Sequence, residues 1–180
     1  MFDKGYKFHC IDNQMVNDGF LVSVHKYNFR TKRRRYIAVV ERYQDDIYVI
    51  KYHAEFHSKS KSKYSFVFND EKPAPIIRTC IDIMLDFYSK NPSASFGFMG
   101  AASSNKKKKK KKISEGKANT QRFRIYRRTM VNFFGDKAFS HYMNKRFSAY
   151  LMINRKKAPI KKFKKAAEIG FSTHYQELDF

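Results

Sequence analysis

Four segments between Gly19 and Phe68 alternate apolar and polar residues, and this alternation limits the fold more than any other feature of the chain. The segments are FLVSVHKY (20–27), YIAVVERY (36–43), IYVIKYHAEF (47–56) and KYSFVF (63–68), each rich in β-branched and aromatic residues. A period of two is typical of β-strands, whose successive side chains point to opposite faces. The interval at 44–46 is short enough for a tight hairpin. The pattern therefore predicts an antiparallel meander, with residues 6–11 as a candidate additional strand.

Two later segments have the three- and four-residue spacing of amphipathic helices. Over 76–90 the apolar stripe comprises Ile77, Cys80, Ile81, Met84 and Tyr88, and over about 119–134 it comprises Phe123, Tyr126, Met130, Phe133 and Phe134. Asn91-Pro92 should end the first of these helices. Asn119 or Thr120 can cap the second, and Gly135 can end it. We therefore expect two main helices, each with one face packed on the sheet.

Three more segments complete the expected secondary structure. SFGFMG (95–100) predicts a short buried strand, RFSAYLMIN (146–154) a last strand, and KKFKKAAEIGF (161–171) a short basic helix. Together the elements indicate the α+β class, with an antiparallel β meander packed by two main helices. A chain of 180 residues has the size of about one domain. We expect a single α+β domain over 1–154 with a flexible lysine-rich loop at 101–117, then a C-terminal extension at 155–180, basic and then acidic.

The positive charge is concentrated in one third of the chain. Residues 1–103 carry 16 basic and 11 acidic side chains, residues 104–165 carry 22 and 2, and residues 166–180 carry none and 3. A net charge of +22 with this asymmetry indicates a polyanionic partner, such as nucleic acid, an anionic membrane face or an acidic protein. Codon composition is the alternative explanation for the lysine run, because the abundant Lys, Asn, Ile, Tyr and Phe all have A/T-rich codons.

Cysteine usage and hydropathy favour a cytoplasmic protein. Cys10 and Cys80 lack metal-ligand spacing and cannot form a disulfide framework, which fits a reducing compartment. The first residues have no signal-peptide core, and no window reaches the ~18 apolar residues that a membrane helix needs. We therefore expect no membrane association.

Four basic groups are the candidate nucleic-acid-binding residues. They are the hairpin tip with Arg33, Arg34 and Arg35; the run Lys106, Lys107, Lys108, Lys109, Lys110, Lys111 and Lys112; the helix residues Arg122, Arg124, Arg127 and Arg128; and the C-terminal residues Lys161, Lys162, Lys164 and Lys165. Lysine and arginine that neutralise phosphates release counterions and give affinity without base recognition. Each group could also be an ordinary solvated surface, and the lysine run favours a linker that assists binding rather than forming the main contact.

The candidate catalytic residues are His53, Glu55 and His57. If the strand at 47–56 continues, alternation places all three on one face, where they could share a metal ion or a proton. The alternative is a strand that becomes polar as it enters the SKSKSK loop (58–63). Asp45-Asp46 is typical of a hairpin turn rather than a nuclease metal site. The sequence contains no GxxxxGK[ST], GxGxxG or GxSxG motif, so a phosphate-cradling enzyme or a hydrolase with a nucleophile elbow is not supported. We expect no cofactor, no resident metal and no small-molecule substrate.

The order of these elements resembles a group of small uncharacterised bacterial proteins. The resemblance rests on a meander, a helix closing on Phe87-Tyr88 and Asn91-Pro92, the strand SFGFMG, and the helix motif Arg122-x-Arg124-Ile125-Tyr126-x-Arg128. In that group helix, Pro, strand and R-x-R-[LI]-Y recur in this order. The resemblance covers roughly residues 20–134 and implies a compact α+β domain in a bacterial cytoplasm, with no implied activity. The lysine run and the basic segment beyond Asn154 depart from the shorter pattern.

These observations lead us to expect a nucleic-acid-binding protein, DNA- or RNA-binding, that contacts mainly the backbone. It would act as a component of a larger bacterial or mobile-element assembly. Two alternatives remain open on the sequence. One is a small nuclease or toxin-type enzyme that acts on RNA or DNA. The other is a protein-interaction or inhibitor module that binds an acidic protein partner.

Overall fold

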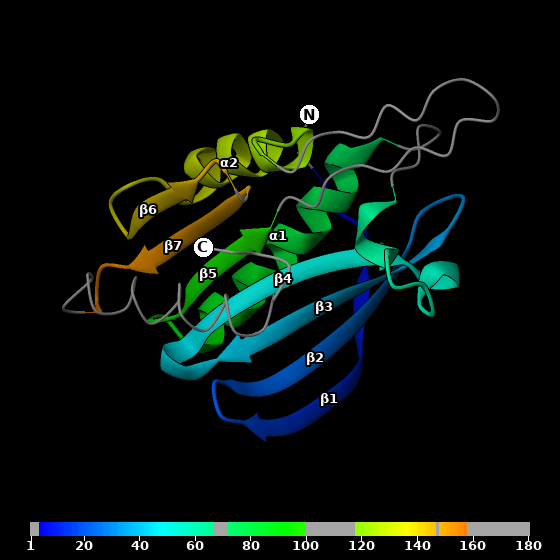
Figure 1. The fold of residues 1–180 in the computed structure, drawn as a ribbon, viewed down its shortest axis with the longest axis horizontal. Coiled ribbons are helices and arrows are strands. Elements are labelled where there is room, and N and C mark those ends of the chain that lie inside the picture. Colours follow the sequence, from blue (N-terminus) through cyan, green and yellow to red (C-terminus); the bar gives the residue numbers. More distant parts are fainter. Residues whose placement is uncertain (1–3, 67–71, 100–117, 147, 158–180) are drawn as a thin grey trace.

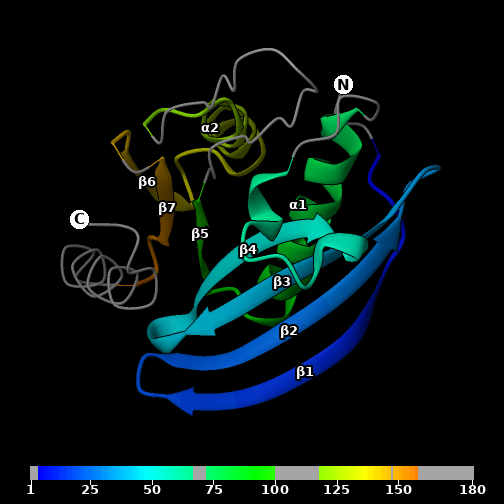
Figure 2. The same cartoon turned by 45° about the vertical axis from the view of Figure 1, so that its right-hand side comes forward.

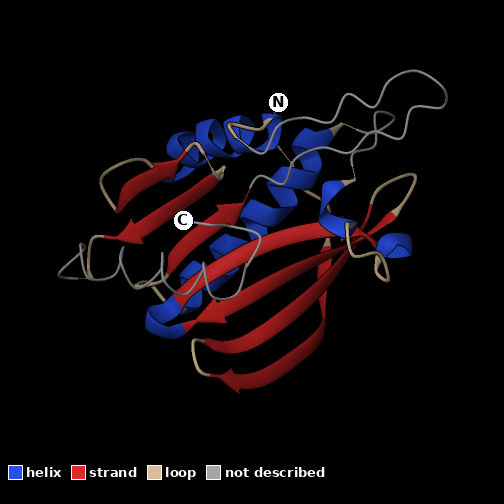
Figure 3. Ribbon diagram, viewed as in Figure 1, coloured by secondary structure: helices blue, strands red, loops and turns tan. Residues whose placement is uncertain are grey.

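The computed structural model describes residues 4–66, 72–99, 118–146 and 148–157. Within them one sheet has the strand order β1-β2-β3-β4-β5-β7-β6. The strands are β1 (Phe8–Asp18), β2 (Leu21–Arg30), β3 (Arg35–Tyr43), β4 (Ile47–Ala54), β5 (Ser95–Met99), β6 (Phe139–Asn144) and β7 (Ala149–Asn154). Two helices, α1 (Pro73–Lys90) and α2 (Gln121–Phe134), lie against it (Figures 1 and 3). The expected mixed α+β class is confirmed.

The first four strands form an antiparallel meander that includes the segments predicted over 20–27, 36–43 and 47–56, together with the candidate additional strand at 6–11. Successive strands β1 to β4 pair antiparallel, and only β4 and β5 among the described neighbours pair parallel. A parallel pair needs a crossover connection, and α1 supplies it between β4 and β5. The tight turn between β3 and β4 is also confirmed, since Asp45 and Asp46 have φ of 60° and 54°. Aspartate tolerates this left-handed conformation better than most residues.

Both helices pack on the same face of the sheet. Ile76, Ile77, Cys80, Ile81, Ile83 and Met84 of α1 and Phe123, Tyr126 and Met130 of α2 are buried with the sheet residues Tyr36, Ala38, Val40, Tyr48, Ile50, Tyr150 and Met152. This is the large core of the molecule. A smaller cluster on the other face comprises Leu21, Tyr43, Ile47, Val49, Leu151 and Ile153. The charged face of α2 therefore points away from the main core.

Several predicted boundaries need correction. Of the strand predicted over 63–68, residues 63–65 form a 3-10 turn and 67–68 lie outside the described residues; the strand predicted over 47–56 ends at Ala54. The strand predicted over 6–11 begins at Phe8 and continues to Asp18, and β6 is not indicated by the sequence pattern. Helix α1 begins earlier than predicted, at Pro73, and β7 begins later, at Ala149. The loop expected at 101–117 and the helix expected at 161–171 lie outside the described residues.

Candidate functional site

The N-terminus of α2 is fixed by polar contacts to the connection between β6 and β7. The buried Thr120 caps the helix, and its Oγ1 accepts a hydrogen bond from the backbone N–H of Phe123 at 3.2 Å. The backbone N–H of Thr120 donates to Oγ of Ser148 at 3.0 Å, and the N–H of Asn119 donates to the carbonyl of Lys145 at 2.8 Å. These contacts hold α2 and Lys145 in a fixed relation to each other.

A cleft of about 410 Å³ lies between α2 and this connection. It is lined by Asn119, Arg124, Arg127, Arg128, Val131, Asn132 and Lys145. The helical repeat explains why these α2 residues line one cleft. Residues 127 and 128 are three and four positions after 124, and 131 is four positions after 127, so all of them share one side of the helix. The opposite side carries the core residues. The cleft therefore presents three arginines and one lysine from a rigidly packed base.

No carboxylate among the described residues faces these cations. Between 118 and 157 the sequence contains ten Lys and Arg residues but only one acid, Asp136. The acid is absent from the cleft lining, and no ion pair within the described part of the chain involves Arg124, Arg127, Arg128 or Lys145. Like charges held this close raise the local potential and attract anions. Guanidinium groups also match phosphate geometry with paired N–H donors.

Two of these side chains already have defined surroundings. Nη1 of Arg124 donates to the carbonyl oxygen of Asn119 at 2.6 Å, which directs its guanidinium along the edge of the cleft. Burial raises the pKa of the Tyr150 phenol to about 12, and the nearby charge of Arg127 partly offsets this increase. The charge of Arg127 thus extends from the helix toward β7.

Arg122, also predicted to bind nucleic acid, points into the protein instead. Its guanidinium donates hydrogen bonds to the backbone carbonyls of Tyr64 and Phe66. The same group lies 5.8 Å from the centre of the Tyr52 ring. Arg122 therefore ties α2 to the segment that follows β4, and the cleft is formed by the other three arginines of the helix.

The basic hairpin tip is ordered but separate from the cleft. Oγ1 of Thr31 accepts hydrogen bonds from the backbone N–H groups of Arg33 and Arg34 at 3.1 and 2.9 Å. Arg35 lies 3.9 Å from Glu55 in an exposed ion pair. The β2–β3 tip projects away from α2 in both views (Figures 1 and 2). The structure therefore does not bring these two basic groups together, and Lys106–Lys112 and Lys161–Lys165 lie outside the described residues.

The expected alternation of His53, Glu55 and His57 on one strand face is wrong. The strand ends at Ala54, and residues 55–57 form a 3-10 turn that removes the period of two. His53 is buried and its Nδ1 is 3.0 Å from the carbonyl of Ala54, while His57 stacks on Phe66 with ring centres 3.9 Å apart. Burial lowers the pKa of His53, which favours the neutral ring.

These three residues do not form a metal site. No set of three His, Cys, Asp or Glu side chains in the part of the chain described by the structure could hold a metal ion. In the part of the chain that the structure describes, no helix is both long enough and apolar enough to cross a bilayer.

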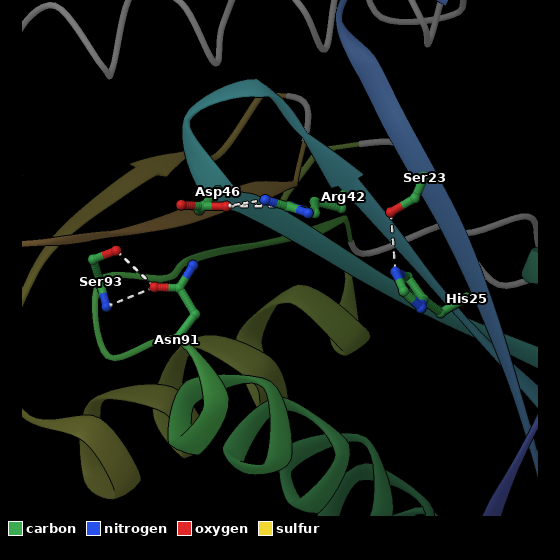
Figure 4. A network of polar contacts seen from close by, with 6 residues as sticks. All are labelled: Ser23, His25, Arg42, Asp46, Asn91 and Ser93. Atoms are coloured by element: carbon green, nitrogen blue, oxygen red, sulfur yellow. Dashed lines mark hydrogen bonds and ion pairs between the residues drawn. The ribbon is translucent and has the colours of Figure 1, made fainter. Parts of the chain in front are cut away.

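Polar contacts that the sequence did not indicate lie at the β3–β4 turn and, close by, at the end of α1 (Figure 4). Arg42 Nη2 lies 2.7 Å from Oδ1 of Asp46, and Oδ1 of Asn91 accepts from the N–H and Oγ of Ser93 at 3.1 and 2.7 Å. Burial would raise the pKa of Asp46, but hydrogen bonds from Asn91 and Arg42 lower it overall. These surroundings favour the charged form of Asp46, and we interpret the contacts as structural.

Comparison with protein-family models, with curated proteins and with solved structures gives no match. The resemblance to a bacterial group therefore stays a prediction. The α2 cleft is the arrangement of described residues that best combines charge, shape and a rigid base.

Proposed function

We propose that the protein binds nucleic acid through the α2 cleft, mainly by contacts to phosphate groups, as a component of a larger assembly. The observation that carries the proposal is the set Arg124, Arg127, Arg128 and Lys145 around one cleft that no described carboxylate lines. The excess of basic residues over 104–165 supports the same conclusion, because a polyanion can contact several of them at once. Contacts from arginine and lysine to phosphates position the nucleic-acid backbone and carry no sequence information by themselves.

The first prediction removes two cations from the cleft. The double variant Arg124→Ala/Arg128→Ala should bind a labelled oligonucleotide more weakly, and the slope of log K against log[salt] should become shallower. The slope falls by about 0.7 to 0.9 for each phosphate that the protein no longer neutralises. Fluorescence anisotropy at several salt concentrations measures both quantities.

The control is Lys26→Ala/Lys90→Ala, which removes the same charge elsewhere. Lys26 pairs with Asp12 at 2.7 Å and Lys90 pairs with Asp86 at 2.7 Å. Lys26 is on β2, far along the strand order from β7 and β6. In the control, the slope of log K against log[salt] should differ from that of wild type by less than the roughly 0.7 to 0.9 expected for the loss of one phosphate contact. Equal slopes in the two double variants, or no binding near physiological salt, would contradict the proposal.

A pull-down from native cells with and without nuclease separates this function from an acidic protein partner. We expect co-purifying material to disappear after nuclease treatment. A stoichiometric protein partner that survives the treatment would overturn the proposal and assign the basic cleft to an acidic protein surface.

A further inference from the structure

An exposed aromatic ring lies at the end of α2, although its place in the apolar stripe predicted burial. Phe133 is 38% exposed, whereas Met130, one turn earlier, is fully buried. The guanidinium carbon of Arg78 on α1 lies 4.9 Å from the centre of the Phe133 ring. The contact holds the ring at the surface beside a cation, where it remains accessible to a flat ligand.

A second cationic cleft lies beside Arg78. It measures about 410 Å³ and is lined by Lys4, Gly5, Tyr6, Lys7, Phe8, His9, Arg78 and Asp82. The N-terminal segment is held on α1 because the N–H of Tyr6 donates to Oγ1 of Thr79 at 2.8 Å. A Cβ at Gly5 would lie 2.5 Å from Oδ2 of Asp82 and 3.0 Å from backbone atoms of Thr79, so any larger residue would require Asp82 or this segment to shift. The one acidic residue that lines this cleft, Asp82, forms an ion pair with Arg78 at 2.7 Å.

Phe133 is therefore linked through Arg78 to the cleft between residues 4–9 and α1. Phe133 follows Arg124 by nine residues, about two and a half turns of an α-helix, so it lies on the other side of α2 from the arginine cleft. Phosphates can bind the cations of either cleft, but an exposed phenyl ring contributes only to a ligand that offers a flat face. Bases within a duplex stack on one another, whereas those of a single strand are free to stack on aromatic side chains. The pairing of a cationic cleft with an accessible ring is the arrangement of single-strand binders.

We infer that the protein takes single-stranded nucleic acid, with a base stacked on Phe133 and the neighbouring phosphates bound in the cleft beside Arg78. The inference rests on the proposed function. It adds to that function a preference for single strands over duplexes and a contact that does not depend on charge.

The second prediction tests the ring with Phe133→Leu. The variant should bind a single-stranded oligonucleotide about 5- to 150-fold more weakly, because stacking on one aromatic ring contributes that much to binding. The slope of log K against log[salt] should stay unchanged. Wild type should bind a duplex more weakly than a single strand, and Phe133→Leu should bind the duplex with the same affinity as wild type. Phe133→Tyr keeps the aromatic face and should restore wild-type affinity.

The matched control is Phe56→Leu, since Phe56 is 63% exposed and its ring contacts His57 rather than Arg78. It should bind like wild type. Equal affinity of Phe133→Leu and wild type for the single strand, or a preference of wild type for duplex, would overturn the inference and leave the phosphate-binding function standing. Absence of all nucleic-acid binding by the wild-type protein would overturn both. Thermal unfolding of each variant confirms that the fold is intact.

Discussion

Individual residues of α2 divide between the core and the surface according to their position on the helix. Met130 has no exposed surface and lies in the main core with Phe123 and Tyr126. Arg124 and Arg128 stand on the opposite side, in the cleft. Because the buried side chains fix the helix against the sheet, the arginines start from a defined position and lose less freedom when they bind an anion.

The third prediction concerns Met130. Met130→Ala should lower the free energy of unfolding by ~2–5 kcal/mol, because it removes a fully buried side chain and leaves a cavity. Urea denaturation measures the change. Met143, which is 49% exposed on β6, supplies the control, and Met143→Ala should change the value by less than about 0.5 kcal/mol. Similar effects at both positions would mean that α2 is turned differently on the sheet.

Residues that differ from the sequence predictions do so where tertiary contacts override a local pattern. Arg122 lies on the border of the helical stripe, but carbonyl acceptors at residues 64 and 66 draw it inward. Phe133 fits the apolar spacing, yet the arginine of a neighbouring helix, remote in sequence, holds it at the surface. His53 and Glu55 were expected on one face, but the strand ends between them. None of these contacts has a signature in a single sequence.

At the level of elements, strong periodicity and end signals were sufficient to predict the helices. Thr120 caps α2 and Gly135, with φ of 59°, follows its last residue, as expected from their chemistry. The meander was predictable because its strands alternate and are joined by short turns. Strand β6 was missed because its sequence, FSHYMN, has weak alternation, and pairing with β7 rather than local preference makes it a strand.

The fourth prediction tests the cap that positions α2. Thr120→Ala removes the acceptor for the N–H of Phe123 and should lower the free energy of unfolding by about 0.5–2 kcal/mol. Denaturant titration measures this decrease. Thr120→Ser keeps the hydroxyl and should retain most of the stability. If serine and alanine are equally destabilising, the methyl group and not the cap is responsible.

For the whole molecule, the main question is how the basic residues share the binding of a polyanion. The described residues place one cationic cleft on α2 and a second between residues 4–9 and α1, while the β2–β3 tip projects away from α2. The seven consecutive lysines at 106–112 precede α2 in the sequence and carry the densest charge of the chain. Because seven consecutive like charges repel one another, we expect the run to assist binding rather than to form the main contact.

The fifth prediction replaces Lys106–Lys112 by alternating Gly and Ser and compares the result with Arg124→Ala/Arg128→Ala. Both variants should weaken binding and flatten the salt slope, but the arginine pair should cost more affinity for each charge removed. Arginine offers paired donors to a phosphate, and these two side chains stand on a packed helix. Anisotropy titrations over a salt series provide the comparison.

The outcome separates a main contact from an accessory one. If the lysine replacement abolishes binding while the arginine pair has no effect, the run forms the main contact and the role assigned to the α2 cleft is wrong. If neither replacement changes binding, the charge of this region serves another partner or reflects codon composition. Both variants remove only positive charge, but only Arg124 and Arg128 occupy positions set by the core. A larger decrease in affinity per charge at these two arginines than in the lysine run would therefore establish that the fold, and not charge alone, determines where the polyanion binds.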